Sequence, residues 1–333
     1  MSGRWGLVLG GGGVLGGAWL VGALAALQEV HGLDARDAEV VVGTSAGSVT
    51  TALLGAGVAV DDLRAHQLGV RPGDGRLAAA VWDYDTAAGG AHPPRPHFHV
   101  GSAALVTRNV GRWHRMPPTA VLAGLMPEGR GSLAAVGALV AGLVPRGWAP
   151  HPGVRVVALD YDTGHRVVFG SARAPAVDLP DAVMASCAIP GWYAPVAIGG
   201  HRYVDGGAWS ATSADLLAGL GLDEVFVLAP MVSFAFDHPG SLLARAERRW
   251  RAQVTRRCLR EVAKVHASGT EVTVLGPGPE DLAAMGSNLM AADRRQQVLR
   301  TSLRTSVAAL RDPEPIGGLP EGIDAGPPIK EAG

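Results

Sequence analysis

The chain has 333 residues, including 47 Gly and 23 Pro, and its 29 basic and 30 acidic side chains give a net charge of −1. With 47% hydrophobic and 18% charged residues, it carries too much core material for a disordered chain, and its neutrality predicts no nucleic-acid partner. Two cysteines, Cys187 and Cys258, are too few for a disulfide scaffold or a zinc site, so we expect a reducing compartment, the cytoplasm.

The first 60 residues alternate between apolar strands and helices. We expect a buried strand over 4–9, a glycine loop over 10–13, a helix over 16–30, a second strand over 39–42 and a helix over 46–56. This alternation is typical of a parallel sheet with helices on its faces. The uncharged residues 5–28 would also fit a signal peptide or a membrane span, but eight of them are Gly, which disfavours one long helix.

The pattern changes over residues 62–151, where Pro pairs interrupt short apolar runs at 119–126 and 132–144. We interpret this region as an insertion or lid within one catalytic domain, residues 1–311. Regular strands are predicted again at 154–160 and 165–169, as a hairpin, and at 224–229 and 271–275. Residues 312–333 are rich in Gly and Pro and are expected to be a disordered tail.

Residues 242–265 are predicted to form a long basic helix. They contain eight basic and two acidic side chains, with apolar residues at helical spacing on the other side: Leu243, Trp250, Val254, Cys258, Val262 and Val265. We favour a surface helix whose apolar face joins the core. The alternative is a helix that makes the protein peripheral to an anionic membrane surface.

The segment Gly43-Thr44-Ser45-Ala46-Gly47 matches G-x-S-x-G between a predicted strand and a predicted helix. That is the context of a nucleophile elbow, in which a serine lies on a strained turn at a helix N-terminus. Small flanking residues are needed for the chain to approach itself so closely, and Gly43 and Gly47 meet that need. The alternative is a Gly-rich turn that contains a serine by chance.

The segment from Gly11 to Gly16 can be interpreted in two ways. It fits the dinucleotide-binding pattern G-x-G-x-x-G, and it also fits a loop whose backbone amides bind an oxyanion. A dinucleotide site requires an acidic residue at the end of the second strand, where this chain has Gly43-Thr44-Ser45. We therefore prefer the oxyanion interpretation.

A serine nucleophile requires a base, and Asp205 is the candidate at the end of a predicted strand. It precedes Gly206 and Gly207, which allow a sharp turn. A carboxylate serves as a base only within hydrogen-bond reach of the serine and gains strength from partial desolvation. The alternative is an aspartate that caps its own turn.

In this order, the motifs resemble those of the patatin-like phospholipases. They are the glycine segment at 11–16, the serine motif at 43–47, Ala185-Ser186-Cys187-Ala188-Ile189-Pro190 with Pro195, and Asp205-Gly206-Gly207. The resemblance covers roughly residues 5–207. It implies an α/β fold of three layers, with a mostly parallel central sheet, helices on both faces and a helical insertion or lid.

The resemblance also implies a Ser–Asp dyad that works without histidine, metal or cofactor. Ser45 would be the nucleophile and Asp205 the base, with the backbone of Gly11, Gly12 and Gly13 as the oxyanion hole. The implied activity is hydrolysis of carboxylic ester bonds in a phospholipid, lysophospholipid or neutral lipid through an acyl-enzyme. The family often has Arg or Lys where this chain has Leu15, which favours a less anionic substrate.

Several other residues are weighed and set aside. The cluster His92, His97 and His99 lacks metal-site spacing and is expected to lie in a solvated loop. His201 shares a strand face with Asp205 and is expected to play a supporting or surface role, and Cys187 is expected to be a buried small residue. Two other functions stay open: an acyltransferase with a histidine base, and a non-catalytic dinucleotide- or lipid-binding protein.

Overall fold

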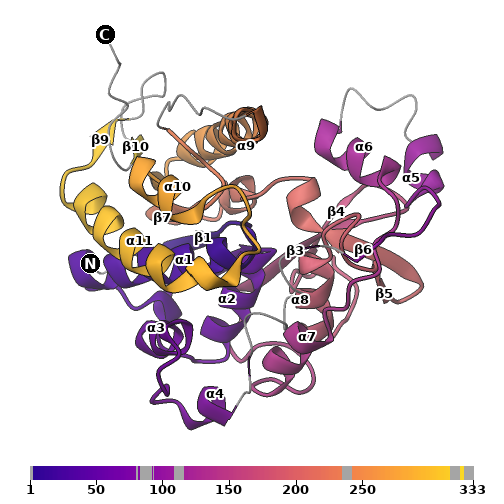
Figure 1. Cartoon of the computed structure of the whole chain (residues 1–333). Coiled ribbons are helices and arrows are strands. Elements are labelled where there is room, and N and C mark those ends of the chain that lie inside the picture. Colours follow the sequence, from indigo (N-terminus) through magenta and orange to yellow (C-terminus); the bar gives the residue numbers. More distant parts are fainter. Residues whose placement is uncertain are drawn as a thin grey trace.

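A computed structural model describes residues 3–79, 82, 92, 94–108, 116–234, 242–315 and 323–325. The described strands form one ten-stranded sheet in the order β5-β6-β3-β2-β1-β7-β8-β10-β9, with β4 paired to β3 (Figure 1). The strands are β1 (Trp5–Leu9), β2 (Val40–Thr44), β3 (Val154–Asp160), β4 (Arg166–Phe169), β5 (Val196–Ile198), β6 (His201–Asp205), β7 (Glu224–Leu228), β8 (Glu271–Leu275), β9 (Glu314–Pro315) and β10 (Ile323–Ala325).

The sheet is parallel through its centre and antiparallel at both edges. Strands β3, β2, β1, β7, β8 and β10 pair in parallel. The pairs of β3 with β4 and β6, of β5 with β6 and of β9 with β10 are antiparallel. The predicted hairpin across 162–164 is therefore confirmed as β3 and β4. The expectation of a disordered tail does not hold for β9 and β10, which extend one edge of the sheet.

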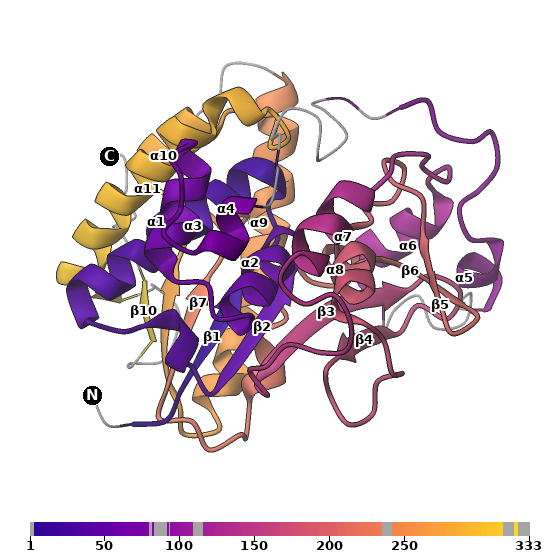
Figure 2. The ribbon, with the colours of Figure 1, turned by 90° about the horizontal axis from the view of Figure 1, so that it is seen from below.

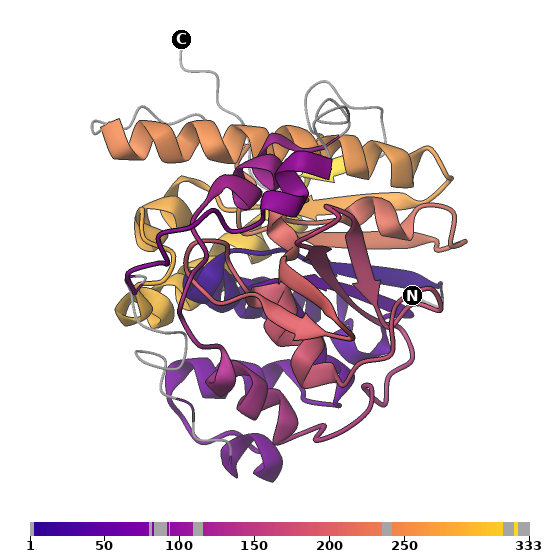
Figure 3. The ribbon, with the colours of Figure 1, turned by 90° about the vertical axis from the view of Figure 1, so that its right-hand side faces the viewer.

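The helices cover both faces of the sheet (Figures 2 and 3). They are α1 (Gly13–His31), α2 (Ala46–Gly55), α3 (Val60–Leu68), α4 (Gly75–Ala79), α5 (Ala103–Arg108), α6 (Pro118–Leu125), α7 (Ala134–Ala141), α8 (Leu179–Cys187), α9 (Leu242–His266), α10 (Pro279–Met285) and α11 (Arg295–Arg311). The predicted run 119–126 corresponds to α6. The predicted run 132–144 corresponds to α7, which is shorter than that run.

Alternating side chains of the central strands divide the core into two layers. In β1, Leu7 and Leu9 face the cluster that contains α1, α2, α3 and α11, whereas Val8 faces the cluster built on α9. In β3, Val157 packs in the α9 cluster, and Leu159 packs with α5 and α6. Residues two apart on a strand point to the same face, so α5, α6 and α9 all cover this face of the sheet. The expected three-layer α/β fold, with a mostly parallel sheet, is confirmed.

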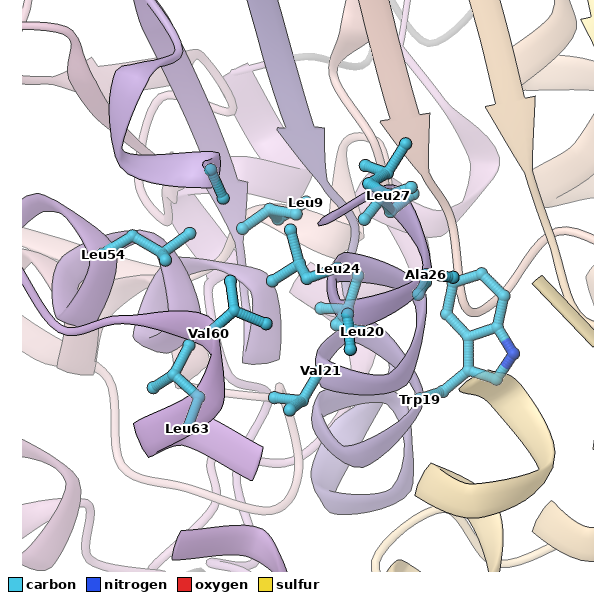
Figure 4. Packing of buried hydrophobic residues seen from close by; sticks show 14 of the residues in the cluster. Leu9, Trp19, Leu20, Val21, Leu24, Ala26, Leu27, Leu54, Val60 and Leu63 are labelled. Carbon is cyan, nitrogen blue, oxygen red and sulfur yellow. The ribbon is translucent and has the colours of Figure 1, made fainter. Parts of the chain in front are cut away.

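Helix α1 is the central helix of one layer. Leu20, Leu24 and Leu27 are buried toward β1 and the helices α2 and α3, and Trp19 points to the other side (Figure 4). Among the described residues, α1 is the helix that is long and apolar enough to cross a membrane, and 67% of its apolar stretch is buried inside the fold. It begins at Gly13, three residues earlier than predicted, directly after the glycine loop.

Candidate active site

Ser45 occupies the sharp turn between β2 and α2. Its backbone has φ 54° and ψ −124°, and among the described residues other than Gly only Ser213 also has a positive φ. Such a conformation costs about 1–3 kcal/mol, which the surrounding packing must overcome. Ser45 directly precedes the first turn of α2, whose backbone amides favour negative charge nearby. The strained strand-to-helix turn that the motif predicts is therefore present at Ser45.

The two glycines of the elbow allow backbone contacts that a side chain would block. A Cβ on Gly47 would lie 1.9 Å from the Leu9 carbonyl oxygen at the end of β1. A Cβ on Gly43 would lie 2.4 Å from the Thr51 hydroxyl. Gly43 and Gly47 thus let β1, β2 and α2 approach one another closely enough to fix the turn at Ser45.

Ser186, at the end of α8, holds the elbow from the opposite side. Its Oγ accepts a hydrogen bond from the Ser45 backbone amide at 2.9 Å and donates one to the Val157 carbonyl at 2.6 Å. The neighbouring Ala188 carbonyl accepts the Asp205 amide at 2.9 Å. The segment 185–190 therefore connects the strand ends that carry Ser45 and Asp205.

Asp205 ends β6 and is only 5% exposed. Its carboxylate accepts the Gly207 amide at 2.7 Å and lines the same cavity as Ser45. Burial raises the pKa of the Asp205 carboxyl to about 6, although the hydrogen bonds from Ser45 and Gly207 oppose the rise. A Cβ on Gly206 would lie 2.4 Å from the Val157 carbonyl oxygen, so this turn too requires a glycine.

The glycine loop lies beside Ser45, as the oxyanion interpretation requires. A Cβ on Gly11 would be 3.2 Å from the Ser45 Cβ. The three amides of the loop differ, however, because the Gly11 amide already donates to the Ala211 carbonyl at 2.8 Å. In the described part of the chain, the amides of Gly12 and Gly13 donate to no other group. This geometry leaves Gly12 and Gly13 as the donors available to a substrate.

The comparisons with known proteins identify the family of the chain. A model of the patatin-like phospholipase family matches residues 7–218, more than half of the chain. The chain belongs to the patatin-like phospholipase family. Membership implies hydrolysis of lipid esters as the general chemistry. Among curated proteins, none has a significant match to the sequence.

Two solved structures resemble this patatin-like phospholipase at low identity. VipD from Legionella pneumophila is 15% identical with a TM-score of 0.37, and the match covers 91% of this chain and 67% of VipD. The type III effector protein ExoU is 17% identical with a TM-score of 0.29, and the match covers 91% of this chain and 53% of ExoU. This chain thus spans about half the length of ExoU.

Two cavities of this chain meet at Ser45. The first, of about 110 Å³, is lined mainly by apolar side chains of α1, α2 and α7, including Leu53, Val136 and Leu139. The second, of about 320 Å³, is lined by the glycine loop, Asp205, α6 and α9. Both predicted apolar runs of the insertion therefore line a cavity that contains Ser45.

His201 and Cys187 differ in their surroundings, because the first is exposed and the second is buried. His201 is exposed, and its Nδ1 lies 3.1 Å from an Asp160 carboxylate oxygen. Cys187 is buried as expected, and burial raises the pKa of its thiol to about 12. In the described residues, no three His, Cys, Asp or Glu side chains come together in a way that could hold a metal ion.

Some residues of the site carried no role in the sequence interpretation. Ser186 was part of the resemblance, but nothing in the linear pattern indicated that its hydroxyl joins Ser45 to β3. Trp250 was placed on the core side of the basic helix, yet it is 38% exposed and lines the larger cavity together with Val254. Leu15 is fully buried, so the position contributes an apolar side chain to the core.

Proposed function

We propose that this chain is a serine acyl hydrolase that cleaves carboxylic ester bonds of lipids through an acyl-enzyme on Ser45. The observation that carries the proposal is that Ser45, held in a strained turn, and the buried carboxylate of Asp205 line one cavity together with the glycine loop. The pKa of about 6 leaves Asp205 ionised at neutral pH and makes it a stronger base than an exposed carboxylate.

The reaction has two halves. In the first, the Ser45 Oγ attacks the ester carbonyl carbon, and its proton passes to Asp205. The tetrahedral intermediate then expels the alcohol, which takes the proton from Asp205. In the second, water attacks the acyl-enzyme while Asp205 accepts its proton, and collapse releases the carboxylic acid and returns the proton to Ser45.

The oxyanion of both intermediates is bound by the backbone amides of Gly12 and Gly13. These amides have no other partner in the described chain, whereas Gly11 shapes the loop through its bond to Ala211. One donor of this kind typically contributes about 2.7–4 kcal/mol to transition-state stabilisation. The N-terminus of α2 adds a favourable field at the same place.

The positions of the two cavities favour one orientation of the substrate. The leaving alcohol must stay near Asp205 to receive its proton, and Asp205 lines only the larger cavity. The acyl chain would then occupy the smaller, apolar cavity between α2 and α7. Helices α6 and α7 would act as the lid elements, since each lines one of the two cavities.

Labelling with a fluorophosphonate probe tests the proposal directly. Wild-type protein is expected to become covalently labelled and to hydrolyse a soluble short-chain ester. Ser45→Ala should do neither, while Ser171→Ala serves as a control because Ser171 follows β4, bonds the Val168 carbonyl and lines neither cavity. Absence of labelling in folded wild-type protein would refute the hydrolase proposal.

A further inference from the structure

Large apolar side chains are exposed around the mouth of the cavity that contains Ser45 and Asp205. Leu122 and Leu125 of α6 are 50% and 49% exposed, Met126 after α6 is 36% exposed, and Trp250 of α9 is 38% exposed. Leu122, Met126 and Trp250 line that cavity. A group of exposed apolar side chains of this kind marks an interaction surface.

Helices α6 and α9 lie on the same side of the molecule (Figures 1 and 3). Leu159 packs with α6 and Val157 packs with α9, and both point to the same face of β3. The β3 residues between them face the other layer. Both helices therefore cover the same face of the sheet, and both line the cavity that contains Asp205.

The outward face of α9 is basic. Arg249, Arg256, Arg260 and Lys264 are exposed and follow one another at spacings that keep them on one side of the helix. Opposite them, Cys258, Val262 and Val265 are buried in the core. Among the side chains of α9 that the structure describes, every exposed charged one is basic.

One of the two acidic residues of this helix, Glu261, is used internally. Glu261 is 3% exposed and accepts hydrogen bonds from Thr212 and from Arg257. It therefore does not neutralise the outward basic side chains. The exposed basic side chains thus lie along the same helix that contributes Trp250 to the rim of the cavity.

We propose that this docking face, formed by Leu122, Leu125, Met126, Trp250, Arg249, Arg256, Arg260 and Lys264, binds the surface of an anionic phospholipid bilayer. Exposed apolar side chains that enter the headgroup region, flanked by cations that meet anionic headgroups, are the combination that interfacial binding requires. Bound in this way, the protein places the cavity mouth against the lipid. The proposal does not depend on the hydrolase assignment, since binding is measured on inactive protein.

The test uses full-length Ser45→Ala protein and co-sedimentation with vesicles of phosphatidylcholine, with and without phosphatidylserine. We expect binding to the anionic vesicles that weakens as salt is raised. Each basic residue near such a surface contributes about fivefold in affinity, so Arg249→Glu with Arg256→Glu should weaken binding at least about thirtyfold. The matched control, Arg173→Glu with Arg300→Glu, changes the same charge at exposed positions outside α6 and α9 and should bind like the parent.

The apolar contribution is tested separately with Leu125→Ser, which does not line the cavity. Its control is Leu220→Ser, because Leu220 is 43% exposed and lies outside both helices. Leu125→Ser, made in the Ser45→Ala protein, should bind anionic vesicles more weakly, whereas Leu220→Ser should bind like the parent. Equal vesicle binding by the Arg249/Arg256 variant and its control, or no binding to anionic vesicles, would overturn the proposal.

A different occupant would give a different result. If a second copy of the chain covers this face, Ser45→Ala protein should form a dimer that Leu125→Ser dissociates, with no vesicle binding, and that outcome also overturns the proposal. Failure of the hydrolase assignment is recognised independently, by loss of fluorophosphonate labelling in protein that still binds vesicles.

Discussion

Replacing Asp205 by Asn separates its role as a base from its role in the fold. Asn keeps an oxygen that can accept the Gly207 amide, which lies 2.7 Å from the carboxylate, but it cannot take the Ser45 proton. General-base catalysis contributes between about 100-fold and 10,000-fold, so kcat/KM should fall by that factor. The assay is hydrolysis of a soluble short-chain ester by protein whose folding is checked by thermal unfolding.

The pH dependence of the wild type follows from the same carboxyl. With a pKa of about 6, Asp205 is ionised in about a tenth of the molecules at pH 5 and in about nine tenths at pH 7. Because the ionised form is the base, kcat/KM should rise through pH 6 and level off above it. A profile that is already flat from pH 4.5 upward would contradict a base with this pKa.

The free energy of unfolding should fall as pH rises, whereas kcat/KM increases. The pKa of Asp205 is raised from 3.8 in the unfolded chain to about 6 in the fold, so the folded state binds more protons between these values and loses stability as pH rises through them. The cost at neutral pH is about 3 kcal/mol. Asp205→Asn, which carries no charge, should therefore unfold at a higher temperature than wild type at pH 7, and the difference should shrink near pH 4.

A matched control is Asp160→Asn. Asp160 is also buried, at 5% exposure, but it bonds the turn at 162–163 and His201 instead of Ser45. This variant should keep wild-type catalysis per folded molecule. His66→Asn adds a second control, because His66 is the histidine that lines the smaller cavity. An Asp205→Asn protein with wild-type kcat/KM, or a His66→Asn protein with none, would refute the Ser–Asp dyad.

The remaining predictions concern the elbow and the acyl cavity. Ser186→Ala leaves the buried Ser45 amide without its 2.9 Å partner, so we expect a loss of about 1–3 kcal/mol in unfolding free energy and slower fluorophosphonate labelling; unchanged values would contradict its anchoring role. Gly47→Ala places a Cβ 1.9 Å from the Leu9 carbonyl and should lower the melting temperature and abolish labelling, whereas Gly17→Ala, with its nearest contact at 3.8 Å, should do neither. Val136→Phe narrows the smaller cavity and should reduce hydrolysis of long-chain esters more than short-chain ones; equal losses on both would exclude this cavity as the acyl site.

Much of the fold could be predicted because its signals are local. Buried strands such as β1 and β2 are short apolar runs, and helix α2 begins where the glycine-flanked serine predicts it. The two main differences from the prediction are the early start of α1 and the presence of strand β10. Helix α1 starts at Gly13 because the Gly12 carbonyl accepts the Gly16 amide and so begins the helical bonds within the glycine run. Strand β10 pairs with the edge of β8.

The sequence by itself determined the chemical groups of the candidate site. It contains a serine between two glycines, an aspartate before two glycines and a run of glycines after the first strand, and each is a short-range pattern tied to backbone conformation. These patterns identify the turns and the side chains that they present. They also identify the family, since the order of such motifs along the chain is linear information.

The tertiary structure alone decided how these groups are used. It showed that the Gly11 amide is taken by Ala211, that Ser186 joins Ser45 to β3, and that Trp250 faces the cavity instead of the core. Each of these contacts joins residues far apart along the chain, so it depends on which helix packs on which face of the sheet. Hydrophobic spacing predicts that a face is buried, but only the packed fold decides against what, and how much of a side chain such as Trp250 stays exposed.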